Sequence, residues 1–201
     1  GIMEKSYGGQ DRMIICVDCD NVLNNLTDKA LELYNLRSGN NIKLEDITTY
    51  SFYDCLLMKD ADEIISLFKE KELWDSLSPL PGAQNVLSKL VKTGHTIYIA
   101  TATNPCNFEW KVNWLAKYYD FIPENNIIRI VNKSLLRADI LIEDSLDNIK
   151  NSFCESICLD YPWNQNSSMD YIFDIHRIKS WYEIEDVINN IEEENRKWNN
   201  A

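Results

Sequence analysis

Short apolar runs recur along this chain, separated by longer segments of mixed polarity. Each run has the length and the β-branched content of a strand. Because the runs are apolar almost throughout rather than strictly alternating, we expect a sheet that is buried on both faces. The predicted strands are residues 14–17, 96–101, 127–130, 139–143 and 156–160.

The segments between the later strands carry apolar residues at helical spacing. Residues 83–92 predict a helix that stops near Gly94, and residues 108–119 predict another. Ser180 and Glu183 form a capping box for a final helix. Strands that alternate with helices predict an α/β fold, a doubly wound parallel sheet covered on both faces.

Residues 24–78 interrupt this alternation and have no clear strand pattern. A helix around residues 30–36 would end at Gly39, and Asp60 with Glu63 predicts the start of a second helix. We therefore expect a small helical insert after the first strand. The predicted organisation is an α/β core at 13–23 and 79–192, a helical cap at 24–78, and flexible ends at 1–12 and 193–201.

Length and charge narrow the classes of function. With 201 residues and 45% apolar side chains, the chain can bury one sizeable core and a small accessory unit. Its formal net charge of −12 argues against binding a nucleic-acid polymer. A small phosphate ester remains compatible, because a metal ion and local lysines outweigh the global charge. No membrane span and no signal-peptide core are evident, so we expect a soluble, cytoplasmic protein.

The cysteines and histidines form no catalytic or metal-binding pattern. Cys16 and Cys19 have the spacing of a redox or zinc motif, but no matched second pair accompanies them. Cys16 lies within an apolar strand, where a free cysteine behaves as a small hydrophobe. Neither His95 nor His176 accompanies a nucleophile in a recognisable motif. We therefore expect the chemistry to depend on carboxylates.

Side chains capable of chemistry gather at the ends of the predicted strands. Asp18 and Asp20 end the first strand two positions apart, so both start on the same side. Thr101 ends the second strand, and Glu143 with Asp144 ends a later one. In a doubly wound sheet, such ends meet in one crevice. Several acids there require a cation or a shared proton, and a divalent metal with a phosphate substrate meets that requirement.

The order of these residues, with Lys133 preceding the acidic strand, resembles the haloacid dehalogenase superfamily of phosphohydrolases. The resemblance covers about residues 14–160, and the insert lies where that superfamily places its first cap. It narrows to the 5′(3′)-deoxyribonucleotidase family. The segments that look like this family are 79–83, 100–101, 111–115, 138–144, 160–164 and 177–181.

Three positions depart from the family pattern. Asn21 follows the second aspartate, where glycine is often found, and Ala102 stands where a serine or another polar residue is common. Glu143 replaces the first residue of a pair that is often Asp-Asp. Asn tolerates left-handed geometry, so Asn21 is compatible with the same turn. These departures bear on substrate range and rate more than on the type of reaction.

The resemblance implies a catalytic role for four residues. Asp18 would be the nucleophile that forms an aspartyl-phosphate. Asp20 would protonate the leaving alkoxide and then activate water. Thr101 and Lys133 would hold the oxygens of the transferring phosphoryl group.

The resemblance also implies Mg²⁺ as the cofactor. The Asp18 carboxylate, the Asp20 backbone carbonyl and Asp144 would bind the ion, with water and phosphate completing six oxygens. Glu143 would orient these ligands.

The insert would supply the pocket for a nucleobase. Aromatic rings can stack on a base with little discrimination between bases, although the same rings could instead pack the insert's own core. Lys111 is a weaker candidate for a phosphate contact, and Trp74 is a more distant candidate for the pocket. The predicted substrate-binding residues are Leu26, Tyr50, Phe52, Tyr53, Thr101, Ala102, Lys111 and Lys133.

The leading hypothesis is a Mg²⁺-dependent phosphomonoesterase acting on deoxyribonucleoside or ribonucleoside monophosphates, with a homodimer as one possible assembly. One alternative is a related phosphatase for another small ester, such as a sugar phosphate or a cofactor precursor. It would share the core but not the base pocket. Another alternative is a non-catalytic relative that binds a nucleotide or a partner. The presence of Asp18, Asp20, Lys133 and Asp144 argues against the last of these.

Overall fold

The structure is a computed structural model that describes residues 12–165, 168 and 174–199. The flexible N-terminal end expected at residues 1–12 falls almost wholly outside the described residues. Among the described residues, no helix is long and apolar enough to cross a membrane.

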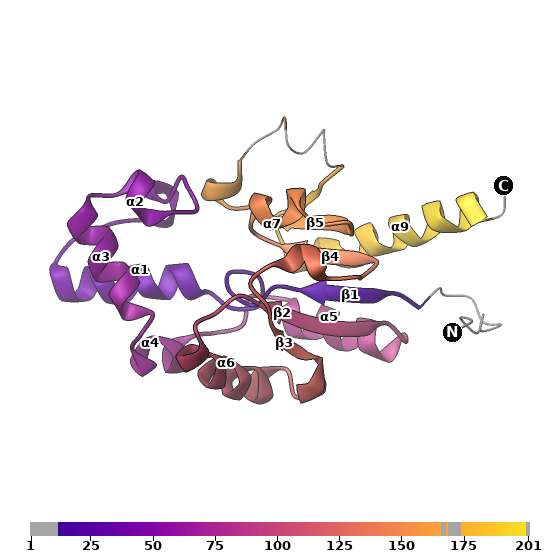
Figure 1. The fold of residues 1–201 in the computed structure, drawn as a ribbon, viewed down its shortest axis with the longest axis horizontal. Helices are drawn as coiled ribbons and strands as arrows, with labels where there is room; N and C mark the ends of the chain where they lie inside the picture. The colour runs from indigo at the N-terminus through magenta and orange to yellow at the C-terminus, as the bar shows by residue number, and fades with distance from the viewer. Residues whose placement is uncertain (1–11, 166–167, 169–173, 200–201) are drawn as a thin grey trace.

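Six parallel strands form one sheet in the order β3-β2-β1-β4-β5-β6 (Figure 1). The first strand lies in the middle, and Val17 pairs with Ile99 on one side and with Ile142 on the other. Its apolar side chains are therefore covered by neighbours in both directions. The strands are β1 (Ile14–Val17), β2 (Thr96–Thr101), β3 (Ile127–Arg129), β4 (Ile140–Glu143), β5 (Glu155–Leu159) and β6 (His176–Ile178).

Helices connect these strands and bury their apolar stripes against the sheet. Val86, Leu87 and Leu90 from one helix enter the same buried cluster as Ile184 and Ile188 from the last. This cluster also contains the inward side chains of the central strands. The helices of the core are α5 (Ala83–Lys92), α6 (Pro105–Tyr118), α7 (Leu146–Lys150) and α9 (Ile184–Asn199).

The sheet confirms the predicted α/β class, with several differences in detail. The strand β6 was not predicted, because His176 and Arg177 leave no apolar run to recognise. The last helix continues to Asn199, so the C-terminal segment expected to fray is helical where it is described. The predicted start at Asp60 is wrong: that helix begins at Met58, and Asp60 lies in its first turn.

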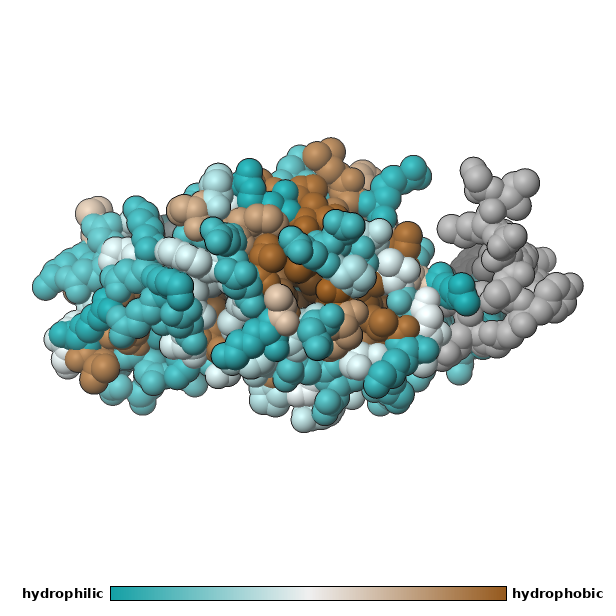
Figure 2. Space-filling view, turned by 90° about the horizontal axis from the view of Figure 1, so that it is seen from below, coloured by the Kyte–Doolittle hydropathy of each residue, from teal (hydrophilic) through white to brown (hydrophobic). Residues whose placement is uncertain are grey.

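The residues between β1 and β2 begin with a helical segment that extends beyond one end of the sheet (Figure 1). Its first helix ends where Gly39 adopts a left-handed φ of 73°, as the glycine predicted. The outer surface of this segment is mainly hydrophilic, whereas apolar side chains gather near the middle of the molecule in the view from below (Figure 2). Its helices are α1 (Leu26–Ser38), η1 (Leu44–Asp46), α2 (Phe52–Cys55), α3 (Met58–Leu67) and α4 (Lys71–Ser76).

The chain enters this segment near residue 24 and leaves it near residue 78, and hydrogen bonds join these two connections. The Asn25 side chain accepts a hydrogen bond from the Ser78 backbone N–H at 2.8 Å, and the Leu80 N–H donates to the Leu23 carbonyl at 2.9 Å. The Trp181 indole donates to the Val22 carbonyl at 2.6 Å. The loop after β1 is thus fixed by partners far away in the sequence.

Candidate active site

The first two acids follow β1, where the sheet ends and the chain must turn. The Asp18 N–H donates to the Ile142 carbonyl at 2.9 Å, which extends the pairing of β1 with β4 by one residue. Asn21 then takes a left-handed φ of 59°, as its tolerance for this geometry predicted. Its side-chain oxygen accepts from the Thr27 N–H at 2.9 Å, which joins this turn to the start of α1.

Lys133 lies between two acids that come from different strands. Its ammonium group donates to Asp18 and, at 2.7 Å, to Glu143. Burial lowers the pKa of Lys133, but Asp18 and Glu143 outweigh burial and raise that pKa above its ordinary value. Lys133 is 3% exposed, so this buried side chain remains charged only because its partners are acids.

Three buried carboxylates surround this lysine. Oxygens of Asp18, Glu143 and Asp144 all lie within 4.8 Å of one another. Burial and the negative charge of Glu143 raise the pKa of Asp18 to about 7, although Lys133 acts in the opposite direction. Burial and Glu143 likewise raise the pKa of Asp144. The cluster therefore carries more negative charge than one lysine balances, and its oxygen donors fit a divalent cation.

The partners of Glu143 and Asp144 differ. One oxygen of Glu143 contacts Lys133, and the other accepts from the N–H groups of Asp144 and Ser145 at 3.3 Å each. The Asp144 side chain accepts from the Trp163 indole at 3.2 Å. Both oxygens of Glu143 thus have protein donors, whereas within the described part of the chain only one oxygen of Asp144 has a donor.

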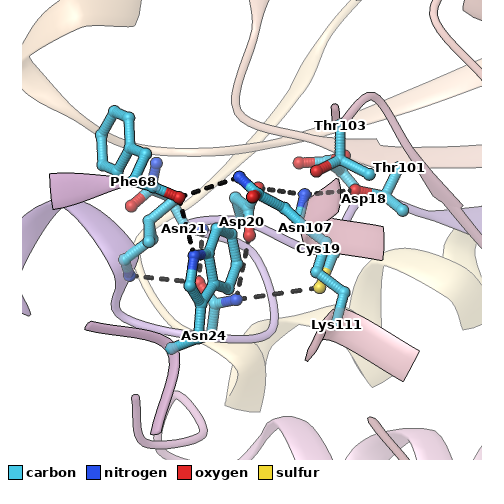
Figure 3. Close-up of polar contacts among 12 residues, drawn as sticks. Asp18, Cys19, Asp20, Asn21, Asn24, Phe68, Thr101, Thr103, Asn107 and Lys111 are labelled. Carbon is cyan, nitrogen blue, oxygen red and sulfur yellow. Dashed lines mark hydrogen bonds and ion pairs between the residues drawn. The ribbon is translucent and has the colours of Figure 1, made fainter. Parts of the chain in front are cut away.

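A second buried lysine, Lys111, is paired with the other aspartate, Asp20. The Lys111 ammonium contacts Asp20 and donates to the Thr101 hydroxyl at 2.7 Å (Figure 3). It also lies 5.4 Å from the centre of the Trp74 ring, within the range of a cation–π interaction. Burial is the largest single influence and lowers the pKa of Lys111, but Asp20, Cys19 and Asp18 together raise that pKa above its ordinary value. Asp20 and Thr101 are thereby joined through one ammonium group.

A pocket of about 570 Å³ opens beside this second lysine. Its wall combines Asp20 and Lys111 with apolar and aromatic side chains from the helical segment. The predicted residues that line it are Leu26, Tyr50, Phe52, Tyr53, Ala102 and Lys111, together with Trp74.

The predicted site residues therefore divide into two groups. Thr101 and Lys133 lie behind the pocket, buried against the acids rather than among the lining side chains. Tyr50 and Tyr53 line the pocket but are 67% and 51% exposed, so neither packs an interior of the segment. Phe52 is partly buried against the hydrophobic core, and the centre of its ring lies 6.1 Å from the centre of the Phe68 ring.

Sequence reasoning missed several residues of the site. Phe68, Asn107 and Trp163 line the pocket, and Asn107 donates to the Phe68 carbonyl at 2.9 Å. Asn24 donates to Asp20 at 3.1 Å. Only Trp163 had a signal, because it falls within a segment that resembles the family. Asparagine is common in loops, so composition did not distinguish Asn24 or Asn107.

The fold and this edge of the sheet define a class of protein. A haloacid dehalogenase family hydrolase from Deinococcus radiodurans, solved with bound phosphate and sodium, aligns with a TM-score of 0.60 at 13% identity, covering 89% of this chain and 95% of its own. A haloacid dehalogenase-like protein from Streptococcus pneumoniae aligns equally well, with a TM-score of 0.60 at 12% identity over 88% and 98% of the two chains. The chain thus has the fold of haloacid dehalogenase-like hydrolases.

Its family follows from sequence. The family model for "5' nucleotidase, deoxy (Pyrimidine), cytosolic type C protein" matches residues 12–193, and the chain belongs to this family. A 5′(3′)-deoxyribonucleotidase of Bacillus subtilis is 28% identical over 175 residues, which are 87% of this chain and 97% of the relative. One from Clostridium acetobutylicum is 29% identical, over 83% and 89% of the two chains. The chain is therefore a phosphoric monoester hydrolase of the 5′-nucleotidase type with an acidic cluster suited to a divalent metal.

Proposed function

We propose that this protein hydrolyses deoxyribonucleoside monophosphates to nucleoside and phosphate, with Mg²⁺ as its cofactor and Asp18 as its nucleophile. One observation carries the proposal: Asp20 and Lys111, which both interact electrostatically with Asp18 of the acidic cluster, also form part of the wall of an aromatic pocket of about 570 Å³. A phosphate held at the acids would leave its nucleoside in that pocket. Named relatives that act as 5′(3′)-deoxyribonucleotidases support the same substrate class.

The first step uses the two aspartates in turn. An oxygen of Asp18 forms a bond to phosphorus while the bond from phosphorus to the sugar oxygen breaks, and Asp20 gives its proton to that oxygen. Lys133 beside Asp18 favours the ionised carboxylate that attack requires. In the second step, Asp20 takes a proton from water, whose oxygen attacks phosphorus and releases phosphate from Asp18.

Lys111 and Thr101 are suited to hold the phosphoryl oxygens. Lys111 contacts Asp20 and donates to the Thr101 hydroxyl, and an ammonium group with a hydroxyl offers donors for the charge that spreads over those oxygens. Lys133 contributes to the same positive field from behind Asp18.

The carboxylates of Asp18 and Asp144 and the backbone carbonyl of Asp20 would hold Mg²⁺. Their oxygen chemistry and excess negative charge fit a hard divalent cation. When bound, the ion supplies positive charge that offsets repulsion between the phosphate and the nucleophile. Glu143 serves as an outer partner, since both of its oxygens already accept from protein donors.

The helical segment 24–78 acts in this proposal as a cap that selects the substrate. Phe52 offers a ring to a base, while Leu26, Ile47 and the buried Trp74 add apolar wall. The core would then determine the reaction and the cap its substrate.

The test is phosphate release from a panel of deoxyribonucleotides, ribonucleotides and sugar phosphates, with and without Mg²⁺. Metal-dependent turnover that favours deoxyribonucleotides, and that disappears in Asp18→Asn, is the expected result. Preference for a sugar phosphate would overturn the substrate while keeping the reaction. Turnover that survives Asp18→Asn would overturn the nucleophile.

A further inference from the structure

Asn24 is a buried side chain with no role in the reaction described so far. It is 1% exposed and lies four residues after Asp20, in the loop between β1 and α1. Its amide nitrogen donates to the Asp20 Oδ1 atom at 3.1 Å and lies 3.7 Å from the Cys19 sulfur (Figure 3). The amide nitrogen of Asn24 is thus directed at the carboxylate of Asp20.

The other end of the same amide holds the loop. The Asn24 oxygen accepts from the Asn21 N–H at 3.2 Å and from the Leu26 N–H at 3.1 Å. Two backbone N–H donors fix this oxygen, so the amide cannot flip to exchange its oxygen and nitrogen. Its N–H groups must therefore point toward Asp20 and Cys19. The loop therefore imposes the orientation of the donor.

The two oxygens of Asp20 consequently have different partners. Oδ1 accepts from Asn24, and Oδ2 contacts Lys111, which belongs to the pocket wall. Asn24 therefore anchors Oδ1, and the carboxylate presents Oδ2 on the side of the pocket wall.

We propose that Asn24 is a positioning residue that holds the Asp20 carboxylate by Oδ1 and so turns Oδ2 toward the pocket. The proposal rests on the proposed function in one respect, the role of Asp20 as general acid. Lys111 alone cannot supply this orientation, because a substrate phosphate competes for its ammonium group. Asn24 has no such competing partner, as its four bonding directions are all occupied within the loop.

The test compares leaving groups in wild type, Asn24→Ala and Asn24→Asp. A deoxyribonucleotide releases a basic alkoxide that needs a proton, whereas a nitrophenyl phosphate releases a phenolate that does not. General acid catalysis contributes about 100-fold or more, so misplacing the acid should lower kcat/KM for the nucleotide, which reports the step that releases the leaving group, by about tenfold or more. The kcat/KM for nitrophenyl phosphate should fall less than about threefold; kcat is not compared, because Asp20 activates water for both substrates in the second step.

Asn24→Asp separates positioning from folding of the loop. It keeps an acceptor for the N–H groups of Asn21 and Leu26 but removes the donor to Asp20. Asn25→Ala is the matched control: it loses a 2.8 Å side-chain contact to the Ser78 backbone, and among the described residues its side chain contacts no acid. We expect Asn25→Ala to keep the wild-type ratio of the two activities, and Asn24→Asp to change that ratio as Asn24→Ala does. Thermal melts of each variant verify that it is folded.

Equal losses of kcat/KM for both substrates in the folded Asn24 variants would overturn the proposal and leave Asn24 a structural residue. The proposed substrate can fail separately. If the wild type releases no phosphate from any deoxyribonucleotide, the same ratio is measured between nitrophenyl phosphate and glycerol phosphate, which also has an alkoxide leaving group.

Discussion

The two lysine–acid groups of this site differ in burial and in the elements that build them. The acidic half consists of Asp18, Lys133, Glu143 and Asp144, all at most 7% exposed and all at or beside strand ends of the sheet. The pocket half consists of Asp20, Lys111 and the side chains that line the pocket, some of them more than half exposed. In the proposed function, the buried acids attack phosphorus and bind the metal, whereas the exposed side chains of the pocket wall would select the substrate and can change without disturbing the core.

The largest effect is expected in the acidic half. Asp18→Asn should lower turnover by on the order of a thousandfold or more, since an amide cannot replace the attacking carboxylate. The fold should survive, because the change also removes one of three mutually repelling carboxylates. Phosphate release and a thermal melt measure the two outcomes. A variant that unfolds would contradict this separation of activity from stability.

The two lysines should differ in how much each contributes to the free energy of unfolding. Lys133→Met leaves two buried acids without their cation, and we expect the free energy of unfolding to fall by about 3–5 kcal/mol. Lys111→Met leaves Asp20, whose side chain is 21% exposed, and should cost only about 1–2 kcal/mol. Denaturant unfolding of both variants measures the difference, and equal losses would contradict the distinction between the halves.

Metal binding should distinguish the halves without any measurement of activity. Mg²⁺ at about 100 times its dissociation constant should stabilise the wild type by about 2.7 kcal/mol. Asp144→Asn should abolish this stabilisation, because it removes a buried ligand. Asp20→Asn should keep most of it, since only the backbone carbonyl of residue 20 is a proposed ligand. Thermal melts at increasing Mg²⁺ provide the measurement, and loss of the shift in both variants would place Asp20 in the acidic half.

The smallest effect is expected at the aromatic wall. Phe52→Ala should raise KM for deoxyribonucleotides by about tenfold with little change in kcat, because stacking on a base contributes about 1–3 kcal/mol. Tyr53→Ala should change KM less, since this ring is 51% exposed and its hydroxyl donates to Asp62. Steady-state kinetics measure both variants. A fall in kcat for Phe52→Ala would indicate that the pocket also orients the reacting phosphate.

Several features of the site could be read from local sequence. Asp18 and Asp20 follow an apolar run, and Glu143 with Asp144 follows another, so their positions at one edge of a parallel sheet needed only the strand pattern. Asn21 was expected to tolerate a left-handed turn, and it has one. The roles of these residues in the reaction remain predictions that the experiments above test.

Other features could not be read in this way. The chain gave no reason to pair Lys111 with Asp20, 91 residues away, or to direct the Asn24 amide at the same acid. Trp163 and Phe68 gave no sign that they line one pocket, because they are far apart in the sequence and follow different elements.

The sequence by itself therefore determined the alternation of strands and helices and the acids that end the strands, because apolar periodicity and residue type act over a few neighbouring positions. Only the tertiary structure decided which lysine serves which acid, which rings face the pocket and which oxygen of Asp20 meets Asn24. These depend on the packing of distant segments, such as Lys133 against Asp18 across 115 residues, where burial and charge are set by the whole fold.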